Sequence, residues 1–272
     1  EERFTAARVK EALRQCGVDE IHEGLGTTGL VAVIRGQGHS SGAMVGLRAD
    51  MDALPMVEHN EFPWKSGKQG LMHGCGHDGH TAMLVVFQPA EEGRGGARAM
   101  INDGLFDRFP MQSVYAMHNW PAMRAGTVGI NMGAMMAAAD RVMIHIAGRG
   151  GHASMPHFTR DPVPVACEIV QALQSFVTRK IDAFDPIVLS VTTITAGTTD
   201  NVIPEDVRMS GTLRSFSATA RARAHEGIRR VAENIAAAHE LSATVEYEFG
   251  YPVTENNADA VAFARKVAND LF

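Results

Sequence analysis

The chain has 272 residues, which is long enough for one large domain or two smaller ones. Hydrophobic residues make up 45% of it and charged residues 21%, a balance that excludes a largely disordered chain, and no apolar run approaches the ~18 residues of a membrane span. The net charge is -6 with no basic block, so we expect no nucleic-acid partner and no membrane association.

The first predicted element is a helix, because Val9 and Leu13 recur at helical spacing and Gly17 follows where a C-terminal cap belongs. Residues 24–29 then match the Gly-x-Gly-x-x-Gly spacing of dinucleotide-binding loops. That motif requires a strand before the glycines and a helix after them, whereas here a helix precedes and a β-branched run follows. We therefore interpret this stretch as a glycine-rich turn into a strand over residues 31–34.

Three predicted strands each run directly into polar residues. They span, in order, residues 43–47 before Asp50 and Asp52, residues 85–89 before Glu91 and Glu92, and residues 113–117 before His118. A glycine- and histidine-rich stretch, residues 72–80, lies between the first two strands, and a helix predicted over 97–103 precedes the third. Because open α/β sheets bind ligands at the carboxyl ends of their strands, we expect these polar residues to share one edge.

The local signals conflict at Leu84 and Val85. Residues 80–84 begin like a helix, yet a strand starts at Val85 with no turn residue between the two. Neighbouring signals that contradict one another are not typical of a continuous natural segment. We therefore expect a helix's worth of residues, on the order of a dozen, to be missing at this join.

The second half of the chain has the order β-α-β-β-α-β, which is typical of a ferredoxin-like α+β fold. Its predicted members are a strand at 141–147, a helical stripe at 165–176, strands at 187–195 and 206–213, a helical stripe at 224–238 and a strand at 243–249. We predict a catalytic α/β domain over residues 1–137, an inserted domain over 138–250, and a return to the first domain over 251–272.

Cysteine and histidine provide the first chemical signal. Cys75 and His77 stand two residues apart between glycines, so that a tight turn lets a thiolate and an imidazole face one centre. The alternative is a small residue in a glycine-rich turn. Cys16 and Cys167 lie on apolar helical stripes and are expected in the core. Because three cysteines form no disulfide framework, a reducing, cytoplasmic location is favoured.

Acidic and histidine residues near the strand ends extend this signal. Taken alone, the doublet Glu91-Glu92 is more typical of a solvated loop, and His118 of a hydrogen-bonded histidine. Beside a metal, however, one carboxylate can bind the ion while the other takes a proton from water. His73 and His80 stand nearby, and one ordinary site cannot take every histidine. Mixed sulfur, nitrogen and oxygen ligands suit zinc and also manganese, cobalt or nickel.

Five motifs together resemble the di-metal amidohydrolase and aminoacylase metallopeptidase family, in the branch of hippurate hydrolase, N-acyl-amino-acid hydrolases and indole-acetyl-amino-acid hydrolases. They are residues 47–55 (LRADMDALP), 73–80 (HGCGHDGH), 87–93 (FQPAEEG), 115–120 (YAMHNW) and 150–153 (GGHA). The resemblance covers essentially the whole chain in order. It implies a zinc-carboxypeptidase-like α/β catalytic domain with an inserted ferredoxin-like lid and dimerisation domain.

The resemblance also implies roles for single residues. The implied ligands of two divalent metal ions are Cys75, whose sulfur bridges them, His77, Glu92 and His118. Glu91 is implied as the general base that activates water and then protonates the leaving amine, with Asp52 or Asp78 orienting a ligand. The implied substrate-binding residues are His152, which reaches a neighbouring subunit's site, Asn201 and Arg214. Without the resemblance, the first two are ordinary turn residues and the third is a solvated strand end.

The expected function is metal-dependent hydrolysis of the amide bond of an N-acyl amino acid, hippurate-like or N-acetylated, to a carboxylate and a free amino acid. A homodimer, or a dimer-based tetramer, is expected through the lid domain. The alternative is a non-catalytic dimeric or binding member with an incomplete metal site. That alternative is kept because the family takes a last metal-binding histidine from a C-terminal segment, and nothing follows Phe272.

Overall fold

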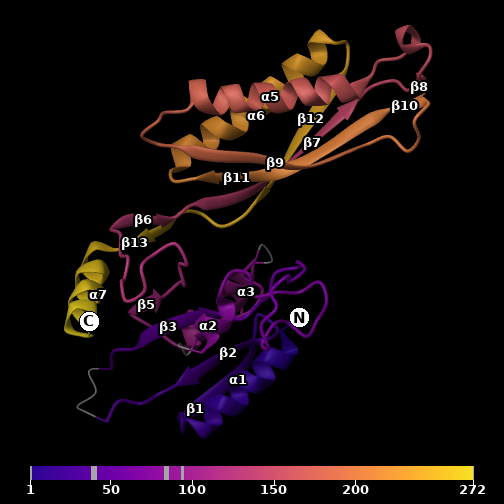
Figure 1. Cartoon of the computed structure of the whole chain (residues 1–272). Helices are drawn as coiled ribbons and strands as arrows, with labels where there is room; N and C mark the ends of the chain where they lie inside the picture. Colours follow the sequence, from indigo (N-terminus) through magenta and orange to yellow (C-terminus); the bar gives the residue numbers. More distant parts are fainter. Residues whose placement is uncertain (1, 38–41, 83–85, 93–94, 272) are drawn as a thin grey trace. The chain divides into compact units, whose positions relative to one another are not determined.

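The computed structural model describes residues 2–37, 42–82, 86–92 and 95–271 (Figure 1). These residues form two compact units, which we call unit 1 (Glu1–Thr127) and unit 2 (Val128–Phe272) and describe separately. Each unit has hydrophobic clusters of its own. The join at Leu84 and Val85, where the sequence predicts a missing helix, lies outside the described residues. Within those ranges, no helix is long and apolar enough to cross a membrane.

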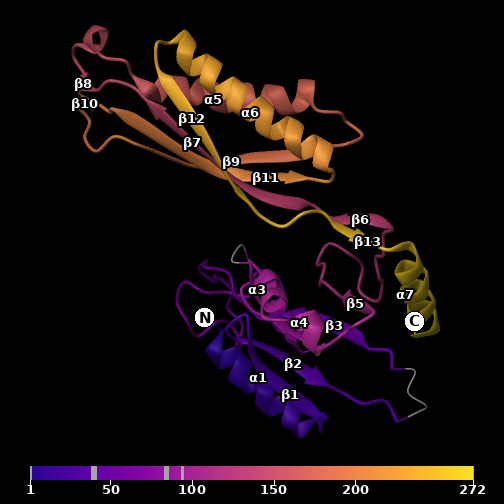
Figure 2. The same ribbon diagram turned by 180° about the vertical axis from the view of Figure 1, so that it is seen from behind.

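Unit 1 is built on a five-stranded mixed sheet with the order β1-β2-β4-β3-β5 (Figure 2). Its strands are β1 (Glu20–Leu25), β2 (Gly29–Val33), β3 (Val45–Asp50), β4 (Val86–Gln88) and β5 (Ser113–Ala116). Strand β3 runs parallel to both β4 and β5, whereas β2 is antiparallel to β1 and β4. The carboxyl ends of β3, β4 and β5 therefore lie at one edge, which confirms the expectation for the polar residues that follow them.

The helices described in unit 1 are α1 (Arg3–Gln15), α2 (His77–Thr81), α3 (Gly96–Asn102) and α4 (Leu105–Arg108). Helix α1 buries Val9 and Leu13 in one hydrophobic cluster with Phe87 of β4. It ends before Gly17, whose φ of 72° fits the predicted cap. Cys16 is exposed, so the expectation that it packs in the core is wrong. It occupies the cap position after the last helical turn, beyond the buried stripe.

Unit 2 contains a four-stranded antiparallel sheet with the order β12-β7-β11-β9. The chain order β-α-β-β-α-β that the sequence predicts is formed by β7 (Ala138–Ala147), α5 (Pro162–Lys180), β9 (Ile187–Ala196), β11 (Asp206–Ser215), α6 (Ala218–Ala238) and β12 (Ser242–Phe249). Both helices lie on the same face of the sheet (Figures 1 and 2). The smaller elements are β6 (Gly133–Met136), β8 (Gly151–His152), the 3-10 helix η1 (Pro156–Phe158), β10 (Val202–Ile203), β13 (Thr254–Asn256) and α7 (Ala258–Leu271).

The core of unit 2 lies between this sheet and its two helices. Alternate residues of β7 and β11 are buried, and α5 and α6 meet where Gly227 faces the ring of Phe176. The side chains of Asp161 and Ser217 cap the two helices by accepting backbone N–H bonds. Cys167 of α5 is exposed, which contradicts the expectation that it lies in the core. It stands beside the buried stripe of the helix rather than on it.

The buried carboxylate of Asp140 bonds the segments where the chain enters and leaves the four-stranded sheet. Asp140 of β7 accepts hydrogen bonds from Nε of Arg221 (2.8 Å), from Nε2 of His225 (2.9 Å) and from the N–H of Gly250 (3.1 Å), which follows β12. Just outside the sheet, β6 and β13 pair with each other in antiparallel register. The incoming and outgoing segments are therefore bonded to one another.

Candidate metal centre

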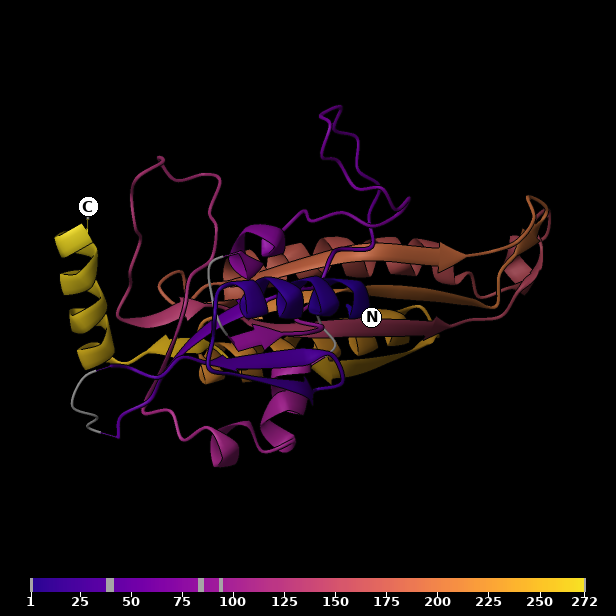
Figure 3. The ribbon, with the colours of Figure 1, turned by 90° about the horizontal axis from the view of Figure 1, so that it is seen from below.

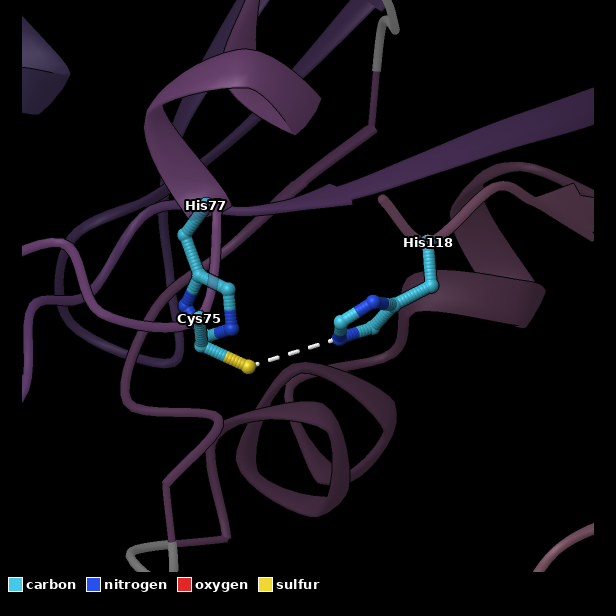
Figure 4. Close-up of side chains that lie close together, drawn as sticks. All are labelled: Cys75, His77 and His118. Carbon is cyan, nitrogen blue, oxygen red and sulfur yellow. Dashed lines mark hydrogen bonds between the residues drawn. The ribbon is translucent and has the colours of Figure 1, made fainter. Parts of the chain in front are cut away.

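A glycine-rich turn places Cys75 and His77 next to the sheet of unit 1. The segment between β3 and α2 extends away from the strands before it returns at this turn (Figure 3). Gly76 has a φ of 84°, which strains any other residue, and a Cβ added to it would lie 3.2 Å from Asn119. Helix α2 then begins at His77, and Figure 4 shows Cys75 and His77 side by side, facing His118.

Three overlapping clusters of metal-binding side chains form here among the described residues, and His77 belongs to each of them; one joins His77 to the buried Asp50 and His80. Sγ of Cys75 lies 3.4 Å from Nε2 of His118, and together with His77 these residues offer ligand atoms within 4.8 Å of one another. His77, Glu91 and Glu92 form a second cluster by the same measure. The structure thus brings together the four residues predicted as ligands and the one predicted as base. Their roles stay predictions.

His77 presents a buried nitrogen that suits a cation. Its side chain is 1% exposed, and its Nδ1 lies 2.9 Å from the backbone oxygen and 3.1 Å from Oδ1 of Asp52. Both partners are acceptors, so Nδ1 carries the proton and Nε2 carries the lone pair. That Nε2 has no hydrogen-bond partner among the described residues, because oxygens of Asp50 and Glu91 lie 3.7 and 4.0 Å away. A metal ion would satisfy this lone pair.

The acidic doublet is held in a turn after β4. Ala90 adopts a positive φ of 49°, and the N–H of Glu92 donates to Oδ2 of Asp52 at 2.8 Å. Asp52 therefore contacts His77 with one oxygen and the doublet with the other. The sequence left open whether Asp52 or Asp78 orients a ligand. Asp52 has these contacts, whereas Asp78 is exposed on α2.

The pKa of Glu91 is raised above its usual value. Burial is the largest cause, the negative charges of Glu92 and Asp50 add to it, and the positive charge of Arg48 opposes it without reversing it. A carboxylate whose pKa is raised toward neutrality is better suited to accept a proton and then release it.

Burial, followed by the negative charges of Glu92 and Glu91, raises the pKa of Cys75 to about 11. In the absence of a cation the thiol therefore stays protonated at neutral pH. A bound metal ion would supply the positive charge that favours the thiolate, so this donor set matches a cation site.

Asp50 and His80 form a buried pair, beside the site, that the sequence alone does not predict. Each is 1% exposed, and Nδ1 of His80 lies 2.6 Å from Oδ1 of Asp50. A signal was available, because His80 follows His77 by three residues and therefore shares its helix face, while Asp50 ends the adjoining strand. His73, in contrast, is exposed.

Comparison with known proteins identifies the family. The model of peptidase family M20/M25/M40 matches residues 46–87 and 83–272, which is most of the chain. The chain belongs to this M20 family. Among its curated relatives, hippurate hydrolase of Campylobacter jejuni is 39% identical over 289 residues, which cover 100% of the M20 chain and 75% of the relative. N-acyl-L-amino acid amidohydrolase of Geobacillus stearothermophilus is 39% identical over 271 residues, covering 92% and 72%.

A solved structure agrees with the α/β fold. The YxeP protein of Bacillus subtilis, described as a dinuclear metal-binding peptidase of family M20, matches with a TM-score of 0.77 at 32% identity. The match covers 100% of this M20 chain and 74% of that protein. The two segments of the family match overlap at residues 83–87, a stretch that includes the join where the sequence predicts a missing helix. The missing helix stays a prediction.

The predicted substrate-binding residues of the M20 chain lie at two places in unit 2, and all are exposed. His152 in β8 lies with Asn201, because the N–H of the next residue, Ala153, donates to the backbone oxygen of Asn201 at 2.9 Å. Arg214 lies near the far end of β11, in the four-stranded sheet. At about 3.3 Å per residue, it is roughly 26 Å along β11 from Asp206, where that strand begins.

Proposed function

We propose that this M20 chain catalyses the metal-dependent hydrolysis of N-acyl amino acids, hippurate-like or N-acetylated, to a carboxylate and a free amino acid. The observation that carries the proposal is that His77 belongs both to a thiol–imidazole cluster and to a carboxylate cluster. This arrangement offers ligands for two ions and leaves one carboxylate for proton transfer. The two curated relatives, hydrolases at 39% identity, support the same reaction class.

The residues that would hold two divalent ions are Cys75, His77, Glu92 and His118. The partnerless buried Nε2 of His77 and the protonated thiol of Cys75 support this, because both gain from a nearby cation. When bound, the ions would polarise the amide carbonyl and lower the pKa of a water molecule. The mixed donors suit zinc, manganese, cobalt or nickel, and do not choose among them.

Glu91 is proposed to move the proton. Its side chain is 34% exposed, which leaves the carboxylate open to a water molecule, and its pKa is raised by burial. Glu91 takes a proton from the water that attacks the acyl carbon and delivers it to the amide nitrogen as the C–N bond breaks. Asp52 positions both partners, since it bonds His77 and the turn that carries the doublet.

The ferredoxin-like domain proposed over residues 138–250 would act as a lid and dimerisation domain on a zinc-carboxypeptidase-like catalytic domain. Arg214 would bind the carboxylate of the amino acid, while His152 would stabilise the oxyanion and Asn201 would bind substrate. His152 lies in the two-stranded β8–β10 sheet, whereas Arg214 lies near the far end of β11 in the four-stranded sheet. A small site that uses both would therefore take one of them from a second copy. This supports a homodimer or a dimer-based tetramer, which we place in the cytoplasm.

The test is hydrolysis of acetyl-, benzoyl- and indole-acetyl-amino acids by the complete, metal-loaded polypeptide. Glu91→Gln is expected to lower kcat by about 10²–10⁴-fold with unchanged metal content, because general acid–base catalysis contributes on this order. Glu61→Gln, on an exposed loop, is the matched control and should keep full activity. If protein with two bound metals hydrolyses none of these substrates, the alternative of a non-catalytic dimeric or binding member is favoured.

A further inference from the structure

Both ring nitrogens of His80 are engaged inside unit 1. Nδ1 lies 2.6 Å from Oδ1 of Asp50, and Nε2 lies 2.7 Å from the backbone nitrogen of Asn119. A backbone N–H can only donate, so Nε2 is the acceptor and the ring proton stays on Nδ1, where it is donated to Asp50. No lone pair is left for a metal ion. His80 therefore differs from His77, whose Nε2 is free to bind one.

Asp50 anchors one end of the hydrogen-bond network that runs through His80 to Asn119. It is the last residue of β3, its Oδ2 pairs with Nη1 of Arg48 at 2.8 Å, and its backbone oxygen accepts a bond from the Thr81 hydroxyl at 2.8 Å. Burial acts to raise the pKa of Asp50, but Arg48, His80 and His77 together outweigh burial and hold that pKa below its usual value. Asp50 is thus an ionised acceptor anchored in the sheet.

Asn119 carries the effect of this network to the metal-binding cluster. Its N–H donates to Nε2 of His80, and its backbone oxygen accepts a bond from Nδ1 of His118 at 2.7 Å. The lone pair of His118 is therefore on Nε2, the atom that lies 3.4 Å from Sγ of Cys75. The rings of His80 and His118 are also in contact, with centroids 4.6 Å apart. The buried His80 thus contacts both the backbone N–H of Asn119, the residue after His118, and the ring of His118.

We propose that His80, held by Asp50, is a positioning residue that directs Nε2 of His118 toward Cys75 and is not itself a metal ligand. This inference rests on the metal centre of the proposed function. Most of this positioning effect is assigned to Nε2 of His80, because that nitrogen accepts the N–H of Asn119 and so holds its peptide in place. The donor at Nδ1 serves to fix the ring.

Two amide variants distinguish the contribution of Nε2 of His80 from that of Nδ1. The longer side chain of His80→Gln places its oxygen near Nε2 and can still accept the Asn119 N–H. The shorter His80→Asn places its amide near Nδ1, so it keeps the Asp50 bond and loses the acceptor. Cobalt(II) titration of the complete polypeptide, followed by sulfur-to-cobalt charge-transfer absorption, measures the affinity. We expect His80→Gln to bind within about threefold of the parent and His80→Asn about 10–100-fold more weakly, the usual effect of losing a group that orients a ligand.

Stability is measured on the same variants. Leu13→Ala, a core substitution in α1, is the control that lowers the urea midpoint without touching this network. A merely structural role for His80 predicts that cobalt affinity follows the urea midpoint in all variants, and this outcome would overturn the proposal. Equal affinities of His80→Gln and His80→Asn would overturn it as well.

The parent protein allows a test that needs no substitution. Nitrogen-15 NMR should find the His80 proton on Nδ1, and a proton on Nε2 would contradict the proposal whether or not the protein turns over substrate. A parent that binds cobalt but hydrolyses no N-acyl amino acid contradicts the proposed function alone, because the comparison of His80 variants can still be made. A parent that binds no cobalt contradicts both.

Discussion

At the scale of single residues, we predict that Trp120 contacts the acyl group of a substrate. Its indole is 52% exposed and stands edge-on to the ring of His118, with 6.0 Å between the centroids. A half-exposed aromatic ring beside a proposed metal ligand offers a stacking surface. A benzoyl group can use that surface, whereas an acetyl group is too small to do so.

We expect Trp120→Ala to raise KM for benzoyl-amino acids by about fivefold, because an aromatic pair contributes about 1 kcal/mol. KM for acetyl-amino acids should change by less than about twofold, since that group gains little from stacking. Steady-state kinetics with both substrates measure the difference. Trp64→Ala, which removes an exposed indole stacked on Phe62, is the matched control and should change neither value. A similar rise for both substrates would show that Trp120 does not contact the acyl group.

The sequence predicts the proposed metal ligands better than it predicts the residues that hold those ligands in position, such as His80. Cys75 and His118 stand out because one lies in a glycine-rich turn and the other beyond the end of a strand. The function of His80 depends on what each ring nitrogen contacts. One of those contacts is a backbone N–H that is 39 residues away in the chain. No local pattern encodes a contact of that kind.

At the scale of secondary-structure elements, a single glycine sets how closely α5 and α6 approach. A Cβ on Gly227 would lie 2.0 Å from the ring of Phe176. We expect Gly227→Ala to lower the free energy of unfolding by about 1–3 kcal/mol, because overpacking outweighs the gain in helix propensity of up to about 1 kcal/mol. Urea unfolding measures the change. Adding Phe176→Leu should recover part of the loss, and simple additivity in the double variant would mean that the clash is not the cause.

Asp140 makes the stability of unit 2 depend on pH. Burial acts to raise its pKa, but the hydrogen bonds from Arg221, Gly250 and His225 outweigh burial and hold the pKa below its usual value. A carboxyl group with a lowered folded-state pKa stabilises fully above its unfolded-state value of about 3.9 and loses that contribution as pH falls through the folded value.

We therefore expect Asp140→Asn to lower the free energy of unfolding by about 3 kcal/mol near neutral pH, because it leaves Arg221 without its charged partner. The difference between parent and variant should stay constant from about pH 7 to about pH 4 and shrink as the pH falls further through the folded-state pKa of Asp140. Urea midpoints along this series provide the measurement. A difference that stays constant below about pH 4 as well would exclude an ionised Asp140 as its source.

The long elements are predictable because their patterns are continuous. The predicted strand at 206–213 and helix at 224–238 fall inside β11 and α6. Strand β3, expected over 43–47, instead runs to Asp50, because its pairing with β4 continues past the apolar run to Gln88. The strands β8 and β10 have two residues each, too few to show a hydrophobic period. They form only by pairing with each other, although they lie far apart in the sequence.

At the scale of the whole molecule, the proposed sharing of sites between subunits has a numerical consequence. A mixture of His152→Ala and Glu91→Gln chains, each inactive alone, should regain about a quarter of the parent activity. Half of the dimers are then mixed, and each mixed dimer has one site with both residues intact. Activity measured after subunit exchange tests this, with Arg214→Ala mixed with Glu91→Gln as a comparison. If the mixture of His152→Ala and Glu91→Gln chains recovers no activity, a role for His152 in a partner's site is contradicted.

The division into a mixed-sheet unit and an antiparallel-sheet unit follows from the sequence, because parallel strands alternate with other elements in the first half and the split βαβ order fills the second.

The pairing of β6 with β13 has a consequence for how this protein can change over time. Because the two connections of the four-stranded sheet are already neighbours, residues 138–250 can be exchanged with the equivalent segment of a homologue without a gap to bridge. Every proposed metal ligand lies in unit 1. Evolution, or an engineer building chimaeras, can therefore replace residues 138–250 while the proposed metal ligands stay as they are.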